Sequence, residues 1–391
     1  MILSPATEAE LADAVRDAAA SRSPLAIEGG GTRAGLGRPA QTQHTLSLAK
    51  LSGITLYEPA ELVIAAHAGT PLAEIETALA SRGQMLGFEP GDARSLYGST
   101  GSPTIGAIAA CNISGPRRIS HGAARDSFIG VRLVNGAGEV VKNGGRVMKN
   151  VTGLDLVKLS CGAHGTLGAM SEVTFKLLPR PETEATIVIA GLADVAAIDM
   201  LSRGLGSPYE VSGAAHLPAG IGGSEARTLL RIENFAPSVT YRTKALRDLL
   251  GAGEIVDADD SHALWRDVAA CAPFAHPDAR ALWRISTAPT RGPVLVAQVT
   301  RMLEARYFYD WGGGLIWLAT DDTGDAGAQI IRAATAAFGG HATLVRASTE
   351  TRASVDVFEP LAAATMTLTK GIKTAFDPQA ILNPGRMYAG V

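Results

Sequence analysis

PLAIEGGGTRAGLG, residues 24–37, decides the fold, because a short apolar strand runs straight into a run of glycines. The strand is predicted over residues 24–28. The residues that follow the glycines, LGRPAQ at 36–41, cannot open a helix. The dinucleotide-binding glycine fingerprint requires such a helix, so it is disfavoured. Two interpretations remain: a nest of backbone N–H groups that binds an anion such as a pyrophosphate, or a surface turn.

A second glycine-rich region, GSTGSPTIGAIAACNISG at 98–115, favours the nest over the turn. It belongs to an uncharged stretch, 95–116, that would be long enough to span a bilayer, but its Gly, Ser, Thr and Pro content predicts loops instead. Such a segment can pack flat against a planar ligand while its N–H and hydroxyl groups donate hydrogen bonds. Together the two regions indicate a nucleotide-type cofactor with a polyphosphate and an aromatic ring.

Composition excludes several classes of protein. The 391 residues exceed the usual size of one hydrophobic core, so we expect two or three domains. The net charge of -3 argues against nucleic-acid binding. Cys111, Cys161 and Cys271 fit neither a disulfide framework nor a zinc site, which favours a reducing cytoplasm. No signal peptide is recognised at the N-terminus.

Hydrophobic periodicity places regular elements around the glycine loops. A helix is predicted over 7–20, where Thr7 opens a capping box. A strand at 63–67 precedes a helix capped by Thr70, and alternating residues around a glycine-rich turn predict a hairpin over 131–142.

From residue 182 onward, strands and helices alternate with few glycine clusters. Strands are predicted over 186–191, 228–233, 281–286, 315–319 and 342–346, and helices over 193–203, 238–250 and 326–338. This pattern predicts an α+β arrangement, with helices on one face of a largely antiparallel sheet. A last helix over 359–376 precedes a turn-rich tail.

Five blocks of sequence occur in an order and at a spacing that are typical of a known protein family. They are residues 24–33, 104–118, 121–126 and 149–168, followed by the tail FDPQAILNPGR at 376–386. In order and spacing these blocks resemble FAD-binding flavoproteins of the vanillyl-alcohol oxidase / p-cresol methylhydroxylase (PCMH) type. The resemblance implies an α+β fold class: a two-part PCMH-type FAD-binding domain with an antiparallel-sheet α/β cap domain.

Within that family, LWRIS at 282–286, DWGGGLIW at 310–317 and GGHAT at 339–343 resemble the FAD-binding subunit of bacterial glycolate oxidase. The resemblance implies oxidation of a short 2-hydroxy acid, with hydride transfer to FAD. It also implies a complex with a catalytic FAD paralogue subunit and an iron–sulfur subunit. Two alternatives stay open: a non-catalytic FAD-fold assembly subunit of such a complex, or an independent FAD oxidoreductase of another small substrate.

The resemblance also assigns cofactor contacts. Pyrophosphate contacts are expected at Gly29, Gly30, Gly31 and Thr32, with Gly35 and Gly37 shaping the loop. Contacts along the ribityl chain and isoalloxazine are expected at Gly98, Ser99, Thr104, Gly106 and Ala109, and contacts toward the adenosine end at Gly162, Gly165 and Gly168. The sequence departs from the family at Ala107, where a glycine is usual, at His121, where Tyr is usual, and at Ala163-His164, where Ser-Glu is common.

Candidate catalytic residues lie in the second half and the tail. Arg284 can clamp a substrate carboxylate bidentately, or it is an exposed sheet arginine. His341 is a candidate base, and Asn383 is placed to reach the flavin edge. Related hydroxy-acid dehydrogenases are thought to use a His-x-His metal cluster, and none of the eight histidines here forms that pattern, so no metal is expected.

Other predictions concern organisation and surroundings. The domains are expected at 1–181 for FAD, at 182–347 for the cap, and at 348–391 for a helix and tail that complete the FAD domain. Trp311 is expected either to cap a pocket or to lie in the core. Arg117-Arg118 is read as a solvated surface pair, with pairing to a partner as the alternative. The chain is expected in the cytoplasm, with any contact to the inner membrane made through its partners.

Overall fold

Two sheets form the first part of the molecule, in which the structure, a computed structural model, describes residues 1–145 and 153–391 of the chain. One sheet is parallel, in the order β1-β3-β2, and the other is antiparallel, in the order β4-β5-β9-β7-β8. The strands are β1 (Ile2–Leu3), β2 (Leu25–Glu28), β3 (His44–Ser47), β4 (Ile54–Glu58), β5 (Val63–His67), β7 (Phe128–Val134), β8 (Val140–Gly144) and β9 (Ala169–Lys176). A short antiparallel pair, β6 (Gln84–Met85) and β10 (Leu178–Pro179), lies beside them.

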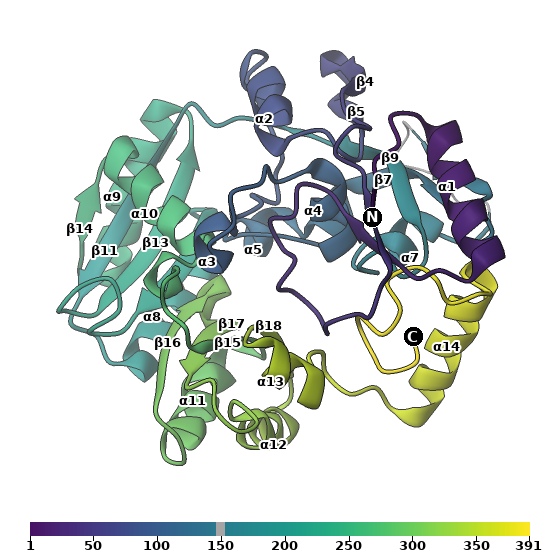
Figure 1. Cartoon of the computed structure of the whole chain (residues 1–391). Coiled ribbons are helices and arrows are strands. Elements are labelled where there is room, and N and C mark those ends of the chain that lie inside the picture. The colour runs from purple at the N-terminus through teal and green to yellow at the C-terminus, as the bar shows by residue number, and fades with distance from the viewer. Residues whose placement is uncertain (146–152) are drawn as a thin grey trace.

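Short helices surround these sheets, on the purple, blue and yellow side of Figure 1. They are α1 (Glu8–Ser21), α2 (Leu72–Ala80), α3 (Arg94–Tyr97), α4 (Ile105–Cys111), α5 (Arg118–His121), α6 (Ala124–Ser127), α7 (Leu156–Ser160) and the late helix α14 (Ala363–Phe376). Leu11 and Val15 of α1, Ile75 of α2 and Ile108 of α4 are fully buried in one apolar cluster. This cluster fixes the position of the glycine loops that follow β2 and precede α4.

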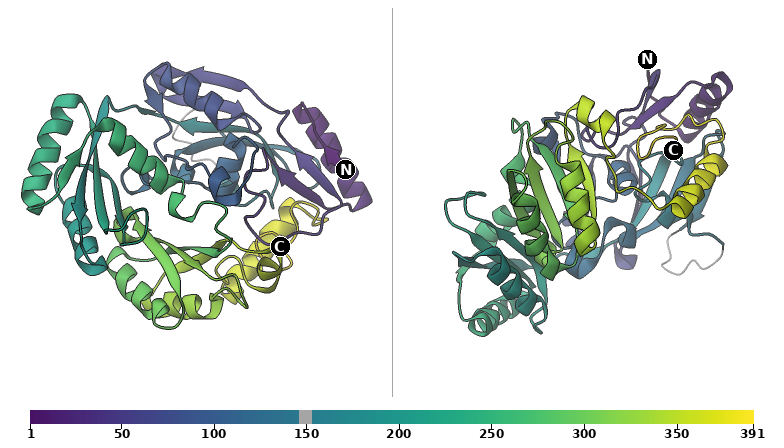
Figure 2. Two further views of the ribbon diagram at one scale, coloured as in Figure 1. Left: turned by 60° about the vertical axis from the view of Figure 1, so that its left-hand side comes forward. Right: turned by 90° about the horizontal axis from the view of Figure 1, so that it is seen from below.

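The second part is built on one eight-stranded antiparallel sheet, the green region in Figures 1 and 2. Its order is β14-β11-β13-β12-β16-β17-β15-β18. The strands are β11 (Thr183–Ala190), β12 (Val211–Leu217), β13 (Arg227–Asn234), β14 (Glu254–Val256), β15 (Ala281–Ser286), β16 (Ala305–Asp310), β17 (Leu315–Thr320) and β18 (His341–Arg346). Its helices are α8 (Asp194–Leu205), α9 (Ala236–Leu250), α10 (Ala258–Ala269), α11 (Gly292–Thr300), α12 (Ala328–Phe338) and α13 (Thr349–Ser354).

Both faces of this sheet are covered. Helices α8, α9, α11 and α12 pack on one face, where their residues join the same apolar cluster as Trp283 and Ile285. The opposite face, which carries Leu282, packs against α10 and against Leu36, Ala93 and Leu96 of the first part. The expectation that all helices lie on one face is therefore wrong for α10, because the face it covers is also the one that meets the first part.

The C-terminal tail returns to the first part of the chain. The N–H of Leu25 donates to the carbonyl of Ile381 at 2.7 Å, so the tail runs beside β2. Buried Lys373 of α14 donates to the carbonyls of Thr166 and Leu382. In Figure 1 the yellow tail accordingly lies next to the purple N-terminal strands.

The sequence predictions of individual elements are largely confirmed. The helix capped by Thr7, the strand at 63–67, the hairpin over 131–142 and the late helix are all present. The largely antiparallel second sheet is confirmed as well.

One predicted helix cap is wrong, and one helix inside the loop-rich segment was not predicted. Thr70 does not cap α2; its hydroxyl accepts from the N–H of Gly53 and donates to the carbonyl of His67. The segment 95–116 is not all loop, because Ile105–Cys111 forms α4. Within the described residues, no helix combines the length and the apolarity that crossing a bilayer demands.

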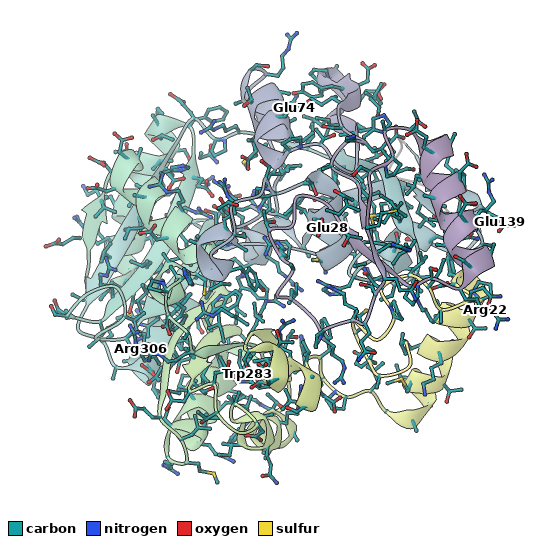
Figure 3. All side chains as sticks on the ribbon, viewed as in Figure 1. Arg22, Glu28, Glu74, Glu139, Trp283 and Arg306 are labelled. Carbon is teal, nitrogen blue, oxygen red and sulfur yellow. The ribbon has the colours of Figure 1, made fainter. Side chains whose placement is uncertain are left out.

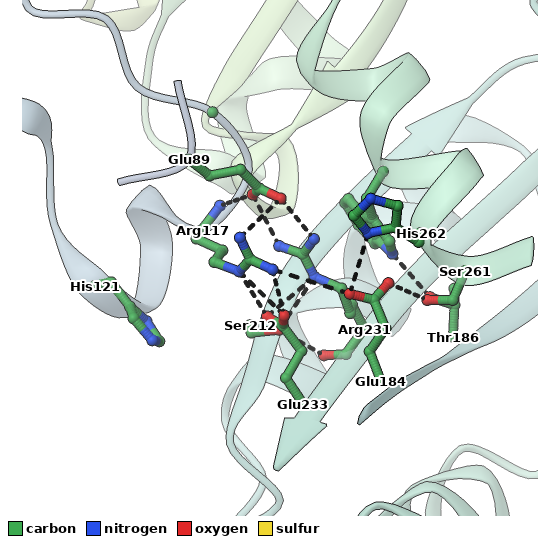
Figure 4. A network of polar contacts seen from close by, with 12 residues as sticks. Glu89, Arg117, His121, Glu184, Thr186, Ser212, Arg231, Glu233, Ser261 and His262 are labelled. Carbon is green, nitrogen blue, oxygen red and sulfur yellow. Dashed lines mark hydrogen bonds and ion pairs between the residues drawn. The ribbon is translucent and has the colours of Figure 1, made fainter. Parts of the chain in front are cut away.

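A polar network joins the two parts (Figure 4). Buried Arg231 of β13 donates to both carboxylate oxygens of Glu89, at 2.8 and 2.9 Å. Arg117 donates to Glu233 from two nitrogens and contacts Glu89 at 3.3 Å. The prediction of a solvated Arg117 is therefore wrong, because its partners lie inside the chain and far away in sequence.

Candidate functional site

A cleft of about 980 Å³, part of it open to solvent, lies over the loop that follows β2. The loop residues Gly29, Gly30, Gly31, Thr32 and Arg33 all line it. Opposite them the cleft is lined by residues at the start of α4 and by the turn before β9. The two glycine regions thus face one common space.

The loop presents unused donors to this cleft. The backbone N–H groups of residues 30–34 donate no hydrogen bond to any other described residue. Unpaired N–H groups are uncommon in folded chains, and a run of them in a glycine loop forms a nest for an anion. The loop does not open a helix, as predicted.

The three glycines of the loop serve different purposes. A Cβ on Gly29 would lie 2.1 Å from Oγ1 of Thr104, and a Cβ on Gly30 would lie 1.8 Å from the carbonyl oxygen of Ser102. These two glycines therefore let the two loops approach each other. Gly31 has a φ of +70°, and its added Cβ would meet no atom of the described residues within 4 Å. Gly31 thus faces open space within the cleft.

Thr104 carries an unsatisfied polar group at the same place. Its side chain is 2% exposed, it lines the cleft, and its Oγ1 has no hydrogen-bond partner among the described residues. Such a buried hydroxyl is costly unless a ligand bonds to it. Gly106, the second residue of α4, also lines the cleft, and its N–H donates to the carbonyl of Ala68, the residue that follows β5.

The other predicted cofactor residues divide into two groups. Gly165 and Gly168 line the cleft, whereas Gly98, Ser99, Ala109 and Gly162 line neither this cleft nor the second one described below. The last four stand behind the lining: the Ser99 hydroxyl donates to the Thr32 carbonyl, and the Gly162 N–H donates to the Ala109 carbonyl. Ala107 and Ala110 of α4 line the cleft instead of Ala109.

Four ionisable residues of this cleft were not assigned a role from the sequence. Arg33 and Arg386 bring positive charge to it, and Glu28, which Figure 3 labels near the middle of the molecule, brings a carboxyl group. Burial raises the pKa of Glu28. Burial lowers the pKa of His164 to about 3, so this residue stays neutral. The proximity of Arg386 to the loop was hidden because the tail lies far away in sequence.

A second cleft, of about 790 Å³, continues from the first and shares Arg33, Cys111 and His164 with it. It lies between the two parts of the molecule, with Tyr97 and Asn112 from the first part facing the cap sheet. A long ligand can therefore extend from the glycine loop to the cap.

Arg284 lines this second cleft from β15. The register places it beside Trp317 of β17 and Thr343 of β18, which line the cleft too. Burial, and then the charge of Arg118, lower the pKa of Arg284 to about 10. Arg284 is therefore a half-buried cation on the cleft wall rather than an arginine on an open sheet face.

The other two candidate catalytic residues are placed differently. His341, two residues before Thr343 on β18, lines neither cleft and keeps part of its surface in solvent; partial desolvation, and then the charge of Arg284, lower its pKa. Asn383 is 2% exposed and has φ 43°. Its Oδ1 accepts from the N–H of Ile27 and its Nδ2 donates to the carbonyl of His164, so both ends of the amide are occupied.

Two further sequence predictions concern this region. Over the described ranges, no three His, Cys, Asp or Glu side chains are grouped to hold a metal ion. The start of the block at 149–168, residues 149–152, lies outside the described residues.

Comparison with known proteins gives matches to flavoproteins. A family model described as "FAD binding domain" matches residues 1–144. The chain is 36% identical to the glycolate oxidase subunit GlcE of Escherichia coli K12, over 97% of both chains. It is 29% identical to the glycolate oxidase subunit GlcD of Bacillus subtilis, over 60% of this chain and 47% of that one.

A solved structure of p-cresol methylhydroxylase with bound substrate has the same fold. It matches with a TM-score of 0.71 at 14% identity, covering 98% of this chain and 88% of that one. The α+β, PCMH-type fold expected from the sequence is thereby confirmed.

Proposed function

Because the chain belongs to the family of FAD-binding PCMH-type flavoproteins that includes the glycolate oxidase subunit GlcE, we propose that it is the FAD-binding subunit of a complex that oxidises glycolate or another short 2-hydroxy acid. One observation carries the proposal. A nest of unpaired N–H groups and a half-buried arginine lie on the walls of two joined clefts. This arrangement suits a dinucleotide cofactor at one end and an acid at the other.

The cleft residues fit FAD. The N–H groups of residues 30–34 would hold the pyrophosphate, and Arg33 and Arg386 would balance its charge. The buried hydroxyl of Thr104 would gain the hydrogen bond that it lacks in the protein. FAD, when bound, supplies the acceptor for the hydride of the substrate carbon.

The second cleft would hold the substrate. Arg284 would bind its carboxylate through two parallel N–H donors, which orients the acid. His341 would take the hydroxyl proton, since its lowered pKa keeps the ring neutral near pH 7. Asn383 would act as a positioning residue, because its amide ties His164 to β2.

The proposed assembly follows the names of the relatives, which are subunits of glycolate oxidase. We propose a catalytic FAD paralogue and an iron–sulfur subunit as its partners in the cytoplasm. Within the chain, residues 1–181 with 348–391 would form the FAD domain and 182–347 the cap. Val355 and Val357 pack with the cap cluster, which favours a slightly later second boundary.

Anaerobic titration with glycolate tests the function. The chain is purified with its co-purifying subunits, and its flavin absorbance is followed while glycolate is added. We expect the flavin of this subunit to be reduced. If it stays oxidised while the complex turns over, the subunit serves in assembly; if other small alcohols reduce it and hydroxy acids do not, the substrate class is wrong.

We expect the FAD to be bound without a covalent bond. His121, at the position where the family usually has Tyr, lines neither cleft, and its Nδ1 contacts the Ser120 hydroxyl. Acid or heat should therefore release all the flavin into the supernatant, which absorbance after precipitation measures. Flavin that stays with the denatured chain would contradict this expectation.

Arg284→Lys is expected to lower kcat/KM for glycolate by roughly tenfold to a hundredfold, or about 1.5–3 kcal/mol, the range for a hydrogen bond to a charged group. One ammonium cannot reproduce the two parallel donors of the guanidinium. The matched control is Arg306→Lys. Arg306 lies on β16 of the same sheet as Arg284, with its guanidinium over the ring of Phe274, and it lines neither cleft. Unchanged steady-state kinetics in Arg284→Lys would show that Arg284 does not bind the substrate carboxylate through two parallel donors.

A further inference from the structure

Two arginines from different parts of the molecule meet at one tryptophan. The guanidinium carbon of Arg118, on α5 of the first part, lies 4.5 Å from the ring centroid of Trp311. That of Arg284, on β15 of the cap, lies 5.1 Å from the same ring. The charge of Arg118 also lowers the pKa of Arg284, so the two cations interact across the boundary between the parts.

Trp311 is held in place by both parts. Its backbone lies in the left-handed region, with φ 54°, which is strained for a tryptophan. The Asp310 carboxylate accepts from its backbone N–H at 2.7 Å, and its indole N–H donates to the Gly115 carbonyl of the first part at 3.1 Å. Trp311 is 8% exposed, so burial and these two hydrogen bonds hold the ring that both arginines contact.

Neither guanidinium is neutralised. Among the described residues, no side-chain hydrogen bond or ion pair is formed by Arg118 or by Arg284. Arg117, the residue next to Arg118, contrasts with both, since Glu89 and Glu233 neutralise it. Two cations on one ring repel each other, and an anion between them would remove that repulsion.

Two acidic groups act on the pair through their charges, Asp126 on Arg118 and Asp310 on Arg284, but neither is ion-paired with these arginines among the described contacts. Burial raises the pKa of Asp310 to about 7, and its carboxyl oxygen already accepts from the Trp311 N–H. The charges of both arginines also contribute to the lowered pKa of His341, which indicates that His341 is close to the same pair. Arg284 therefore lies on the wall of the substrate cleft, next to the proposed base, and Arg118 stands behind that wall, on the far side of the boundary between the parts.

We propose that Arg118 and Arg284 together bind the carboxylate of the substrate, so that Arg118 is a second specificity-determining residue. This inference rests on the proposed function. The occupant is a small carboxylate and not a protein segment, because Arg284 lines the cleft that continues from the cofactor cleft. Since one arginine comes from each part, the bound acid also links the cap to the first part.

Binding of oxalate tests the proposal without turnover. Oxalate is a small carboxylate that has no carbinol hydrogen to give up, and its Kd is measured by titration calorimetry on the FAD-loaded chain with its co-purifying subunits. Arg118→Gln and Arg284→Gln should each weaken the oxalate Kd by about tenfold or more, as expected when a charged donor is lost. Arg306→Gln, at the outer side of the cap in Figure 3, should leave it unchanged.

Arg118→Met is the second variant, since it keeps an apolar stem on the Trp311 ring and removes only the charge. It should show the same weakening as Arg118→Gln. A wild-type oxalate Kd in either Arg118 variant with normal FAD content would overturn the proposal. Reduction of the wild-type flavin by glycolate reports separately on the proposed function, so loss of oxalate binding without any flavin reduction would support the anion site and contradict the activity.

Discussion

Gly31→Val should give colourless protein that takes up no FAD. Gly31 has φ +70°, a region that a β-branched side chain avoids, so the loop conformation that FAD needs would be destabilised by about 1–3 kcal/mol. In addition, the added Cβ would meet no atom of the described residues within 4 Å, so the valine would occupy the space of the cleft in which the N–H groups of residues 30–34 are free to bind an anion. Flavin absorbance per chain, before and after incubation with FAD, measures the loss.

The control for backbone strain is Gly83→Val. Gly83 has φ +63°, is equally open to an added Cβ and lies outside both clefts, so this variant should keep its flavin. Gly30→Val should fail differently, because its Cβ would strike the Ser102 carbonyl and push the two loops apart. Full flavin occupancy in Gly31→Val would show that the loop is only a surface turn.

The glycine loop was predictable because its signal is local. One stretch of fourteen residues contains both the apolar strand residues and the run of glycines. β2 and the glycine loop form at the positions that this stretch predicts. Nothing local, in contrast, distinguishes Gly30 from Gly31. Which glycine touches Ser102 and which faces the cleft depends on a second loop about seventy residues away.

Helix α4 was not predicted because tertiary contacts, and not its own sequence, stabilise it. IGAIAAC contains a glycine and two isoleucines and is too short to be stable alone. Ile105 and Ile108 are fully buried, α4 contacts β5 and β9 of the antiparallel sheet, and the N–H of Gly106 bonds to the carbonyl of Ala68. Strand β12 was missed for a similar reason: every residue of VSGAAHL is buried, so no alternation marks it.

Local sequence was also insufficient to assign roles to the arginines near the site. Arg117 and Arg118 are adjacent and chemically identical, and no local pattern says which one is neutralised. Glu233, which pairs with Arg117, lies 116 residues away, and Arg118 meets Trp311 across the boundary between the two parts. Only the fold separates a structural arginine from one that can bind an acid.

Arg231→Leu should destabilise the chain by about 3–5 kcal/mol, the cost of removing one partner from a buried charge network. Arg231 is 1% exposed and holds Glu89 by two hydrogen bonds, while its guanidinium also lies 4.7 Å from the Trp265 ring. Burial would raise the pKa of Glu233, but Arg231 and Arg117 hold it at about 2. Without Arg231, only the Arg117 charge would remain to balance the carboxylates of Glu89, Glu184 and Glu233 in Figure 4. Urea denaturation of the FAD-loaded chain measures the change.

A double-mutant cycle separates this network from simple packing. Arg227→Leu, on the same strand, removes an arginine whose side chain, among the described residues, bonds to the Gly222 carbonyl alone, so it should cost less than about 1 kcal/mol. If charge balance is the cause, Glu89→Gln combined with Arg231→Leu should cost clearly less than the two single changes added together, because the double variant buries one charge fewer of each sign. Strict additivity would instead assign the loss to the packing of Arg231 on Trp265. Because Glu89 comes from the first part and Arg231 from the cap sheet, a positive coupling would also measure how firmly the network holds together the two walls of the second cleft.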